Sequence, residues 1–312
     1  MILLLTGLHG FIGSNLVSHL KANHAIYGLD IISPEKEGII KTYSWNDLNN
    51  LPEVDTIIHL AGKAHDTKNK SEAQTYFNIN TGLTQKIFDY FLQSKAKRFI
   101  FFSSVKAAAN SVEGDVLIED VIPKPVGPYG ESKIAAEQYI NSQFSTLNSQ
   151  FKKVYILRPC MIHGPGNKGN LNLLYGVVKK GFPYPLGAFE NKRSFTSIDN
   201  LTFVIEQLLE KNIPSGIYNV SDDETLSTNE LIHLMARVMN KPARVWNLPP
   251  KLVSLLAKIG TAIHFPLNTG RLQKLTENYV VSNEKIKKAL NITQMPVSAT
   301  EGFTKTIKSF LE

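Results

Sequence analysis

Short apolar runs alternate with amphipathic stretches through the first half of the chain. The runs that are apolar throughout lie at residues 2–6, 25–29, 56–60, 98–103 and 154–157. Between several of them, apolar residues recur every four positions, as they do at Ile12, Leu16 and Leu20. Such runs predict strands that are buried on both faces, and the stretches between them predict the helices that cover those faces. We therefore expect an α/β fold built on a doubly wound parallel sheet of the Rossmann type.

The character of the chain changes after Pro159, where glycine and proline become frequent and indicate loops. Helical patterns return near residues 201–209 and 227–239, and a strand-like run lies between them at 216–220. We expect residues 1–165, with return segments near 197–221, to form the Rossmann domain. Residues 166–312 are expected to form mainly a smaller, loop-rich C-terminal lobe.

The most apolar stretch of the second half covers residues 253–265, but Lys258 and His264 interrupt it. A membrane-spanning helix needs about 20 apolar residues, so we expect no stable membrane insertion. The pattern favours a helix with one buried face, and contact with a membrane surface is the alternative. Residues 1–5 are apolar but lack a basic segment and a cleavage site, so we expect no signal peptide.

Composition and charge narrow the class of protein further. The 312 residues are 43% hydrophobic and 20% charged, as in ordinary globular proteins, and the net charge is +7. The lysines are spread along the chain rather than clustered with aromatic residues, which argues against nucleic-acid binding and suits a small anionic substrate. Cys160 is the single cysteine, so we expect no intramolecular disulfide, no zinc or other metal site, and a reducing compartment, the cytoplasm.

A glycine-rich turn follows the first predicted strand. Gly7, Gly10 and Gly13 are spaced three residues apart between that strand and a helix. The first permits a tight turn, the second lets the backbone approach a pyrophosphate, and the third lets helix and strand pack closely. Asp30 ends the second predicted strand, where a carboxylate can bind the hydroxyls of an adenosine ribose and repel a 2′-phosphate. The sequence therefore predicts a site for NAD rather than NADP. A structural turn with a surface aspartate is the alternative.

Tyr129 and Lys133 stand four residues apart, on one face of a predicted helix that begins near Gly130. A free phenol has a pKa of about 10. The Lys133 cation, together with the positive nicotinamide of NAD+, would favour the phenolate. Tyr129 is therefore a candidate general base for an alcohol that loses a hydride, and a general acid in the reverse direction. Ser104 follows the strand at 98–103, at the sheet edge where doubly wound folds bind ligands, and it can hydrogen-bond the reacting oxygen.

These motifs resemble those of the extended short-chain dehydrogenase/reductases, in the NAD-dependent sugar-nucleotide epimerase/dehydratase family and its UDP-glucose 4-epimerase-like subgroup. The resemblance covers nearly the whole chain. It rests on Asn80 and on residues 6–13, 59–62, 101–105, 128–133, 157–159, 163–166 and 193–199.

The resemblance implies roles for individual residues. It makes Ser104, Tyr129 and Lys133 catalytic, with Asn80 supporting the lysine through a helix kink and a water. Besides Tyr129 and Lys133, the residues that it places around NAD are Gly7, Gly10, Phe11, Ile12, Gly13, Asp30, Leu60, Ala61 and Gly62. The residues that it places against the UDP-sugar substrate are Ser104, Asn170, Leu171, Arg193 and, by a looser match, Arg271. For Arg193, a solvated loop cation is the alternative. The resemblance also implies a homodimer in which helices near 82–94 and 130–144 pair between subunits.

The chain departs from the family pattern near the predicted sugar pocket. Met161 stands where many members carry an asparagine that contacts substrate, and residues 107–109 are alanines where members often have Val-Tyr-Gly. Val105 and Lys106 replace the Asp-Glu pair of the 4,6-dehydratases, so we expect no dehydratase activity.

These departures favour one activity over its alternatives. Alanines and an apolar Met161 would leave room for a sugar to turn over, which favours a UDP-sugar 4-epimerase. Simple packing of Met161 and a mere change of the loop at 107–109 are the alternatives. The alternative is a 4-reductase of UDP-4-keto-6-deoxy-sugars in surface polysaccharide synthesis. A non-catalytic NAD-binding sensor on the same fold is a third interpretation.

Overall fold

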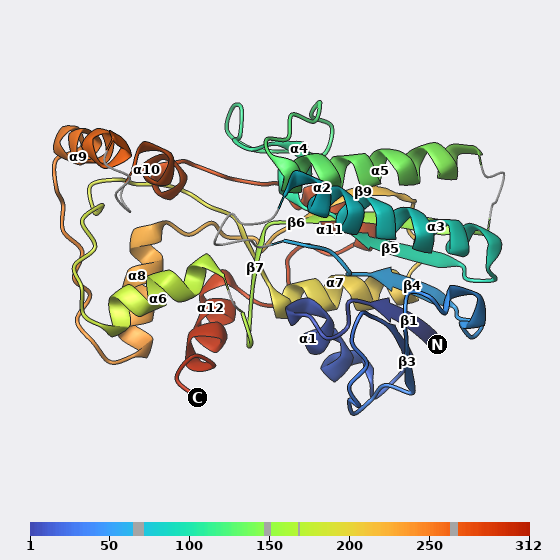
Figure 1. The fold of residues 1–312 in the computed structure, drawn as a ribbon. Coiled ribbons are helices and arrows are strands. Elements are labelled where there is room, and N and C mark those ends of the chain that lie inside the picture. Colours follow the sequence, from blue (N-terminus) through green and yellow to red (C-terminus); the bar gives the residue numbers. More distant parts are fainter. Residues whose placement is uncertain (65–71, 147–150, 168, 263–267) are drawn as a thin grey trace.

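The computed structural model describes residues 1–312 except 65–71, 147–150, 168 and 263–267, and its centre is a seven-stranded sheet (Figure 1). The strands are β1 (Ile2–Thr6), β2 (Ala25–Leu29), β3 (Lys41–Tyr43), β4 (Thr56–His59), β5 (Arg98–Phe102), β6 (Lys153–Pro159) and β9 (Gly216–Val220). They lie in the order β3-β2-β1-β4-β5-β6-β9, and every neighbouring pair is parallel. The predicted doubly wound parallel sheet is confirmed.

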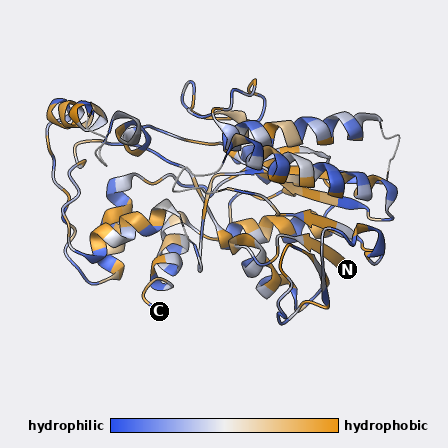
Figure 2. Cartoon of the chain, viewed as in Figure 1, coloured by the Kyte–Doolittle hydropathy of each residue, from blue (hydrophilic) through white to orange (hydrophobic). Residues whose placement is uncertain are grey.

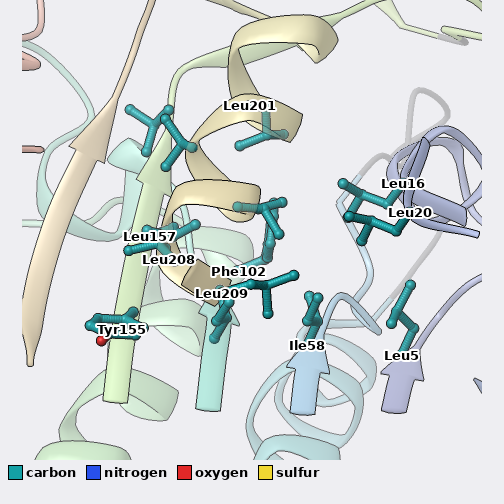
Figure 3. Packing of buried hydrophobic residues seen from close by; sticks show 14 of the residues in the cluster. Leu5, Leu16, Leu20, Ile58, Phe102, Tyr155, Leu157, Leu201, Leu208 and Leu209 are labelled. Atoms are coloured by element: carbon teal, nitrogen blue, oxygen red, sulfur yellow. The ribbon is translucent and has the colours of Figure 1, made fainter. Parts of the chain in front are cut away.

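Helices cover both faces of this sheet. They are α1 (Phe11–Leu20) and α7 (Ile198–Glu210) on one face, and α3 (Leu83–Gln93) and α5 (Pro128–Thr146) on the other. Because side chains alternate along a strand, Leu3 and Leu5 pack into the core under α1 and α7, whereas Leu4 packs into the core under α3 and α5. Figure 3 shows the first of these cores, with Leu208 of α7 close to Leu157 of β6. Burial on both faces explains why these strands are apolar throughout.

Short elements complete the sheet domain. They are the 3-10 turn η1 (Leu48–Asn50), α2 (Ala73–Tyr76), the π-helical turn η2 (Phe77–Gly82) and α4 (Val105–Ala108). β5 ends one residue earlier than predicted, at Phe102, because the chain then turns into α4. The Ser104 hydroxyl caps that helix by accepting the Lys106 N–H.

The second lobe is helical and has its own core (Figures 1 and 2). Its helices are α6 (Asn170–Lys179), α8 (Thr228–Val238), α9 (Pro250–Ala262), α10 (Thr269–Thr276) and α12 (Ala299–Lys308). Tyr175, Met235 and Phe303 bring α6, α8 and α12 together in this core. The predicted capping box is present at α8, where Ser227 and Glu230 bond each other's backbone N–H. Among the described residues, no helix is long and apolar enough to cross a membrane.

The two lobes meet at a small parallel pair, β7 (Met161–His163) and β8 (Phe195–Ser197). The buried His163 ring stacks on Phe303 of α12, with ring centroids 3.7 Å apart. The chain then returns to the sheet twice. The first return, α7 and β9, was expected near residues 197–221. The second is α11 (Glu284–Leu290), whose Ile286 and Leu290 lie in the core under α1 and α7.

Candidate active site

The glycine loop joins β1 to α1 and has the geometry of a phosphate cradle. Gly7 has φ +68°, and a Cβ there would lie 2.8 Å from the main chain of Ala61. A Cβ at Gly13 would lie 2.5 Å from the Cα of Leu8. Both positions therefore require glycine, one for its conformation and both for close approach. α1 begins directly after Gly10, which supplies no capping side chain, so the first turn presents its N–H groups and dipole toward this loop.

Asp30 lies beside this loop at the end of β2, with its carboxylate held in place. The backbone N–H groups of His9 and Ile31 donate to its two oxygens, at 3.2 Å and 2.7 Å. Lys36, which sequence reasoning missed, reaches the same place: its ammonium donates to the Ser14 hydroxyl at 2.8 Å. Burial lowers the pKa of Lys36, and the nearby Asp30 charge opposes that shift. The loop thus offers a fixed carboxylate and one adjacent cation.

The other residues predicted to line the cofactor lie along the same edge. Leu60, Ala61 and Gly62 follow directly after β4, next to the glycine loop. Phe11 and Ile12 form the first turn of α1, and Ile12 packs against the core beneath it. The structure therefore brings the predicted cofactor residues together at the carboxyl ends of β1, β2 and β4, where open α/β sheets bind ligands.

Ser104 and Tyr129 meet at the carboxyl end of the adjacent strand, β5. Ser104 is the N-cap of α4, and Tyr129 is the second residue of α5. The Ser104 side chain hydrogen-bonds the phenol and lowers its pKa, but burial is the larger effect and raises the pKa of Tyr129 above its ordinary value. The phenol is therefore protonated at neutral pH unless further positive charge stabilises the phenolate.

Lys133 lies one helical turn after Tyr129 and is buried. Its ammonium donates to the main-chain oxygen of Phe102 at 2.7 Å. A Cβ on Gly62 would lie 3.1 Å from the lysine Nζ. The ammonium therefore lies next to residues 60–62, the segment after β4 that is predicted to line the cofactor. Burial lowers the pKa of Lys133 to about 8, and the Glu137 carboxylate opposes the shift. A lysine with this environment is cationic at neutral pH but costs folding energy.

Asn80 lies within the π-helical turn η2, at the place where a helix kink was expected. Its amide donates to the Ser132 hydroxyl at 2.9 Å and accepts the Lys63 N–H at 2.7 Å. A Cβ on Gly62 would also lie 3.0 Å from the Asn80 oxygen. Gly62 therefore adjoins both the Asn80 side chain and the Lys133 ammonium. π-helical turns are frequent at functional sites.

A buried chain of hydrogen bonds joins Asn80 to the cofactor loop. The Thr84 hydroxyl donates to the Asn80 main-chain oxygen at 2.6 Å, so it must accept from His59 Nε2, 2.9 Å away. His59 Nδ1 must then accept from the Thr6 hydroxyl, 2.6 Å away, and that hydroxyl accepts the Ala61 N–H. Burial, and secondarily the Lys133 charge, lowers the pKa of His59 to about 3. His59 is therefore a neutral connector with one defined tautomer.

A second buried network, which sequence reasoning missed, joins the residue before Ser104 to the helix that carries Lys133. Arg158 of β6 donates to both oxygens of Glu137, at 3.0 Å and 2.6 Å. The Ser103 hydroxyl also donates to Glu137. Ser103 precedes Ser104, and Glu137 lies one turn after Lys133 on α5, so this pair links the elements that carry both candidate catalytic residues to β6. The sequence signals were a Glu four residues after the lysine and the Arg158 of the matching stretch 157–159.

Lys106, which follows Ser104 by two residues, belongs to a group of cations that also contains Arg193 and Lys274. We call these three residues the cationic group. Its ammonium donates to the Asn110 main-chain oxygen at 2.7 Å and lies 4.1 Å from the centroid of the Tyr279 ring. Burial lowers the pKa of Lys106 to about 8. In the sequence, Lys106 is marked only as one of the two residues that replace the Asp-Glu pair of the dehydratases.

Arg193 belongs to the same cationic group. Its guanidinium donates to the Lys274 main-chain oxygen, and burial lowers its pKa. The charges of Arg193 and Lys274 both act to lower the pKa of Lys106, and Glu277 is the carboxylate that opposes them. Lys106, two residues after Ser104, thus shares its surroundings with two further cations and one carboxylate. A group with this charge balance suits a substrate with more than one negative charge.

Of the remaining predicted substrate residues, the structure describes the side chain of Leu171 alone. Leu171 is buried in the core of the second lobe, so only its main chain could meet a ligand. The side chains of Asn170 and Arg271 lie outside the described residues. Cys160 is buried, and burial raises the pKa of its thiol, so it is unsuited to act as a nucleophile. In the described residues no cluster of three or more His, Cys, Asp or Glu side chains could hold a metal.

Comparison with known proteins agrees with this geometry. Residues 3–221 match the model of the family described as "NAD dependent epimerase/dehydratase family". The chain is similar to a UDP-glucose 4-epimerase of Vibrio cholerae, with 30% identity over 99% of this chain and 95% of that protein. It is also similar to the N-acetyl-alpha-D-glucosaminyl-diphospho-ditrans,octacis-undecaprenol 4-epimerase of Escherichia coli O157:H7, with 28% identity over 93% and 86%. Among solved structures, the UDP-glucose 4-epimerase of Thermotoga maritima shares the fold, with a TM-score of 0.76 and 21% identity over 100% of this chain and 99% of that one.

Proposed function

Because this chain belongs to the NAD-dependent epimerase/dehydratase family, we propose that it is an NAD-dependent enzyme that inverts C4 of a UDP-linked sugar. The observation that carries the proposal is the hydrogen bond between Ser104 and Tyr129, one turn from a buried Lys133 and beside the cofactor loop. The two relatives named above are both 4-epimerases of sugars attached to a diphosphate.

The residues present fit the dinucleotide. The first turn of α1 supplies N–H groups for a pyrophosphate, the required glycines leave room for it, and Asp30 is held where ribose hydroxyls can bind. When bound, NAD accepts a hydride from the sugar and returns it. The fixed Asp30 carboxylate favours NAD over NADP, since a 2′-phosphate would meet a negative charge there.

The chemistry of the chain's own residues is proton transfer at the C4 oxygen of the sugar. As a hydride leaves C4, Tyr129 takes the hydroxyl proton and Ser104 holds the oxygen, which leaves a ketone. Lys133 supplies positive charge that favours the tyrosinate. The ketone then turns over in the pocket, and Tyr129 returns the proton while the hydride reaches the opposite face. Ala107 and Ala108 are buried, so of the residues expected to leave room for the sugar only Ala109 and Met161, both half-buried, can line the pocket. These two side chains would offer few polar anchors to the sugar, which favours the rotation.

The cationic group suits the diphosphate of the substrate. Arg193 and Lys106 are both half-buried cations whose desolvation an anionic ligand would offset. Arg271 and the residue pair Asn170 and Leu171 stay predicted contacts of the same diphosphate.

We also propose a homodimer in a cytoplasmic, reducing compartment. Helices α3 and α5 run side by side on the outer face of the sheet (Figure 1), and their pairing with a second copy would form a four-helix bundle.

One experiment separates the epimerase from a 4-reductase. The enzyme is given UDP-glucose or UDP-GlcNAc with catalytic NAD+, and the C4 epimer is sought by NMR. In parallel it is given a UDP-4-keto-6-deoxy-sugar with NADH, and the absorbance of reduced nicotinamide is followed. We expect the epimer to form without net consumption of cofactor. Stoichiometric oxidation of NADH without any epimer would establish the reductase instead.

A further inference from the structure

Helix α9 carries two apolar stripes, of which the described part of the chain covers only one. Val253, Ala257 and Gly260 are buried and face the lobe. The other stripe consists of Leu252, Leu255, Leu256 and Ile259, which are between 45% and 55% exposed. These four positions follow the i, i+3, i+4, i+7 spacing of a helix face that normally packs against something. We call them the α9 face.

The α9 face lies at the outer end of the second lobe, away from the sheet. Figure 1 places α9 at the edge of the molecule beside α10, and Figure 2 shows hydrophobic residues on its turns. Leu275 of α10 adds a further side chain that is 38% exposed. An apolar stripe of this length on the surface of a protein marks an interaction site.

The charges carried by α9 and α10 have one sign. Lys251 and Lys258, two turns apart on the same helix, are exposed along one border of the stripe. From residue 250 to 276 the sequence has four Lys or Arg residues and no Asp or Glu. Such a helix, apolar on one side and basic at its border, is typical of segments that lie in the interface of an anionic bilayer.

We propose that the α9 face binds the anionic phospholipid surface of a membrane, with the four aliphatic side chains in the interface and Lys251 and Lys258 among the headgroups. A second copy of this chain fits the face less well. Pairing two α9 faces would bring lysines together, and no carboxylate of α9 or α10 could neutralise them. Anionic headgroups supply the missing negative charge.

The proposed membrane face adjoins the active site through α10. Arg193 donates to the main-chain oxygen of Lys274, and the Asn191 amide donates to that of Leu275, at 3.3 Å. The cationic group that suits a substrate diphosphate is therefore attached to the helix that packs against α9. Membrane binding would hold the enzyme with its diphosphate site near the bilayer surface.

The test uses the full-length enzyme and flotation with vesicles. One set of vesicles is phosphatidylcholine alone and the other contains roughly one-third phosphatidylglycerol. We expect the anionic vesicles to bind at least about tenfold more protein, and the binding to weaken with salt. The double variant Leu255→Glu/Ile259→Glu should abolish binding, and Lys251→Gln/Lys258→Gln should reduce it about tenfold. Ile122→Glu is the matched control, because Ile122 is an exposed aliphatic residue elsewhere, and its binding should be unchanged.

Two further measurements distinguish loss of membrane binding from unfolding of the variant and from failure of the proposed enzymatic function. Thermal unfolding shows whether the Leu255→Glu/Ile259→Glu variant is folded, and turnover of a soluble sugar nucleotide should be unchanged in it, whatever the enzyme's reaction is. Absence of flotation with either vesicle, or flotation that survives this variant, would overturn the proposal. So would a change from dimer to monomer caused by the variant in light scattering, which would assign the α9 face to a second copy.

Discussion

Lys133 Nζ donates a 2.7 Å hydrogen bond to the main-chain oxygen of Phe102, the last residue of β5. The bond ties α5, which carries Tyr129, to the strand that leads into Ser104. It also holds an ammonium in a buried place, where burial lowers its pKa to about 8. The relationship therefore has a proposed catalytic benefit and a cost in stability, and the two can be measured separately.

Replacing Lys133 with methionine should stabilise the fold while it abolishes turnover. The lowered pKa corresponds to a penalty of about 3 kcal/mol at neutral pH, and the lost bond to Phe102 offsets about 1 kcal/mol of it. We expect the free energy of unfolding of cofactor-free Lys133→Met to exceed that of the wild type by about 2 kcal/mol at pH 7. Denaturant titration measures this difference, with Lys97→Met, an exposed lysine, as the control.

The pH dependence of that difference has a defined sign. Below pH 8 the lysine is charged in both the folded and the unfolded state, so the full penalty is present. Above pH 8 the folded state loses the proton first, and the two proteins should approach each other in stability until about pH 10.5. A difference that grew over this range would contradict the assignment of a buried, charged Lys133.

Replacing Tyr129 with phenylalanine should remove nearly all turnover and leave cofactor binding intact. The substitution deletes only the hydroxyl that transfers the proton, so kcat should fall by about 10²-fold to 10⁴-fold. Turnover is followed by NMR, and NAD binding by fluorescence quenching. A variant that kept near-normal kcat would exclude Tyr129 as the acid and base.

Asp30 should set the preference for NAD over NADP. Its carboxylate is fixed by the His9 and Ile31 N–H groups, so a 2′-phosphate cannot displace it. We expect wild-type enzyme to bind NAD(H) more tightly, and Asp30→Ala to lose at least about tenfold in that preference, with Lys36 free to meet the phosphate. Glu35→Gln removes an exposed carboxylate from the same loop and should have no effect. Tighter binding of NADP(H) by the wild type would refute this role.

Lys106 should contribute to substrate binding rather than to proton transfer. We expect Lys106→Met to raise KM for the sugar nucleotide about tenfold with a smaller effect on kcat. Because burial lowers the pKa of Lys106 to about 8, wild-type kcat/KM should decline as the pH rises through 8, and the decline should be shallower in the variant, where only Lys133 still loses its proton over that range. Lys124→Met, on the exposed loop that follows, is the control.

The homodimer can be tested without substrate. Ala135 lies on the side of α5 opposite its buried face, where a second copy would pack. Light scattering at micromolar concentration should show a dimer for the wild type and a monomer for Ala135→Arg. Ser18→Arg, on the opposite side of the sheet, should stay dimeric. A monomeric wild type would disprove the predicted four-helix bundle.

The sequence predicted the sheet well because its strands are buried on both faces. Leu3 and Leu5 are buried in one core and Leu4 in the other, so consecutive positions of β1 are all apolar. A short run of this kind is typical of a strand that is covered on both faces. The glycine loop and the Tyr129–Lys133 spacing were equally visible, because each depends on neighbours along the chain. Their catalytic and cofactor roles stay predictions until the variants above are measured.

Other features depend on contacts between distant parts of the chain and left no pattern. The family resemblance implied a helix kink at Asn80, but the bond from the Asn80 amide to Ser132 joins residues 52 positions apart, which a helical spacing rule does not contain. Likewise, Glu137 and Arg158 become a pair only once α5 lies on β6. Lys106 has an ordinary place in its sequence, and its environment comes from Tyr279 and Arg193, more than 80 residues away.

The second return of the chain to the sheet bears on how the protein forms during synthesis. β9 is the partner of β6, and α11 covers that end of the sheet with Ile286 and Leu290. When residues 1–165 have been synthesised, β9 is still missing from the edge of β6, and α7 and α11 do not yet cover the core. Such an intermediate invites aggregation until the last thirty or so residues emerge. The sheet would therefore be completed only when α11 emerges, near the end of translation.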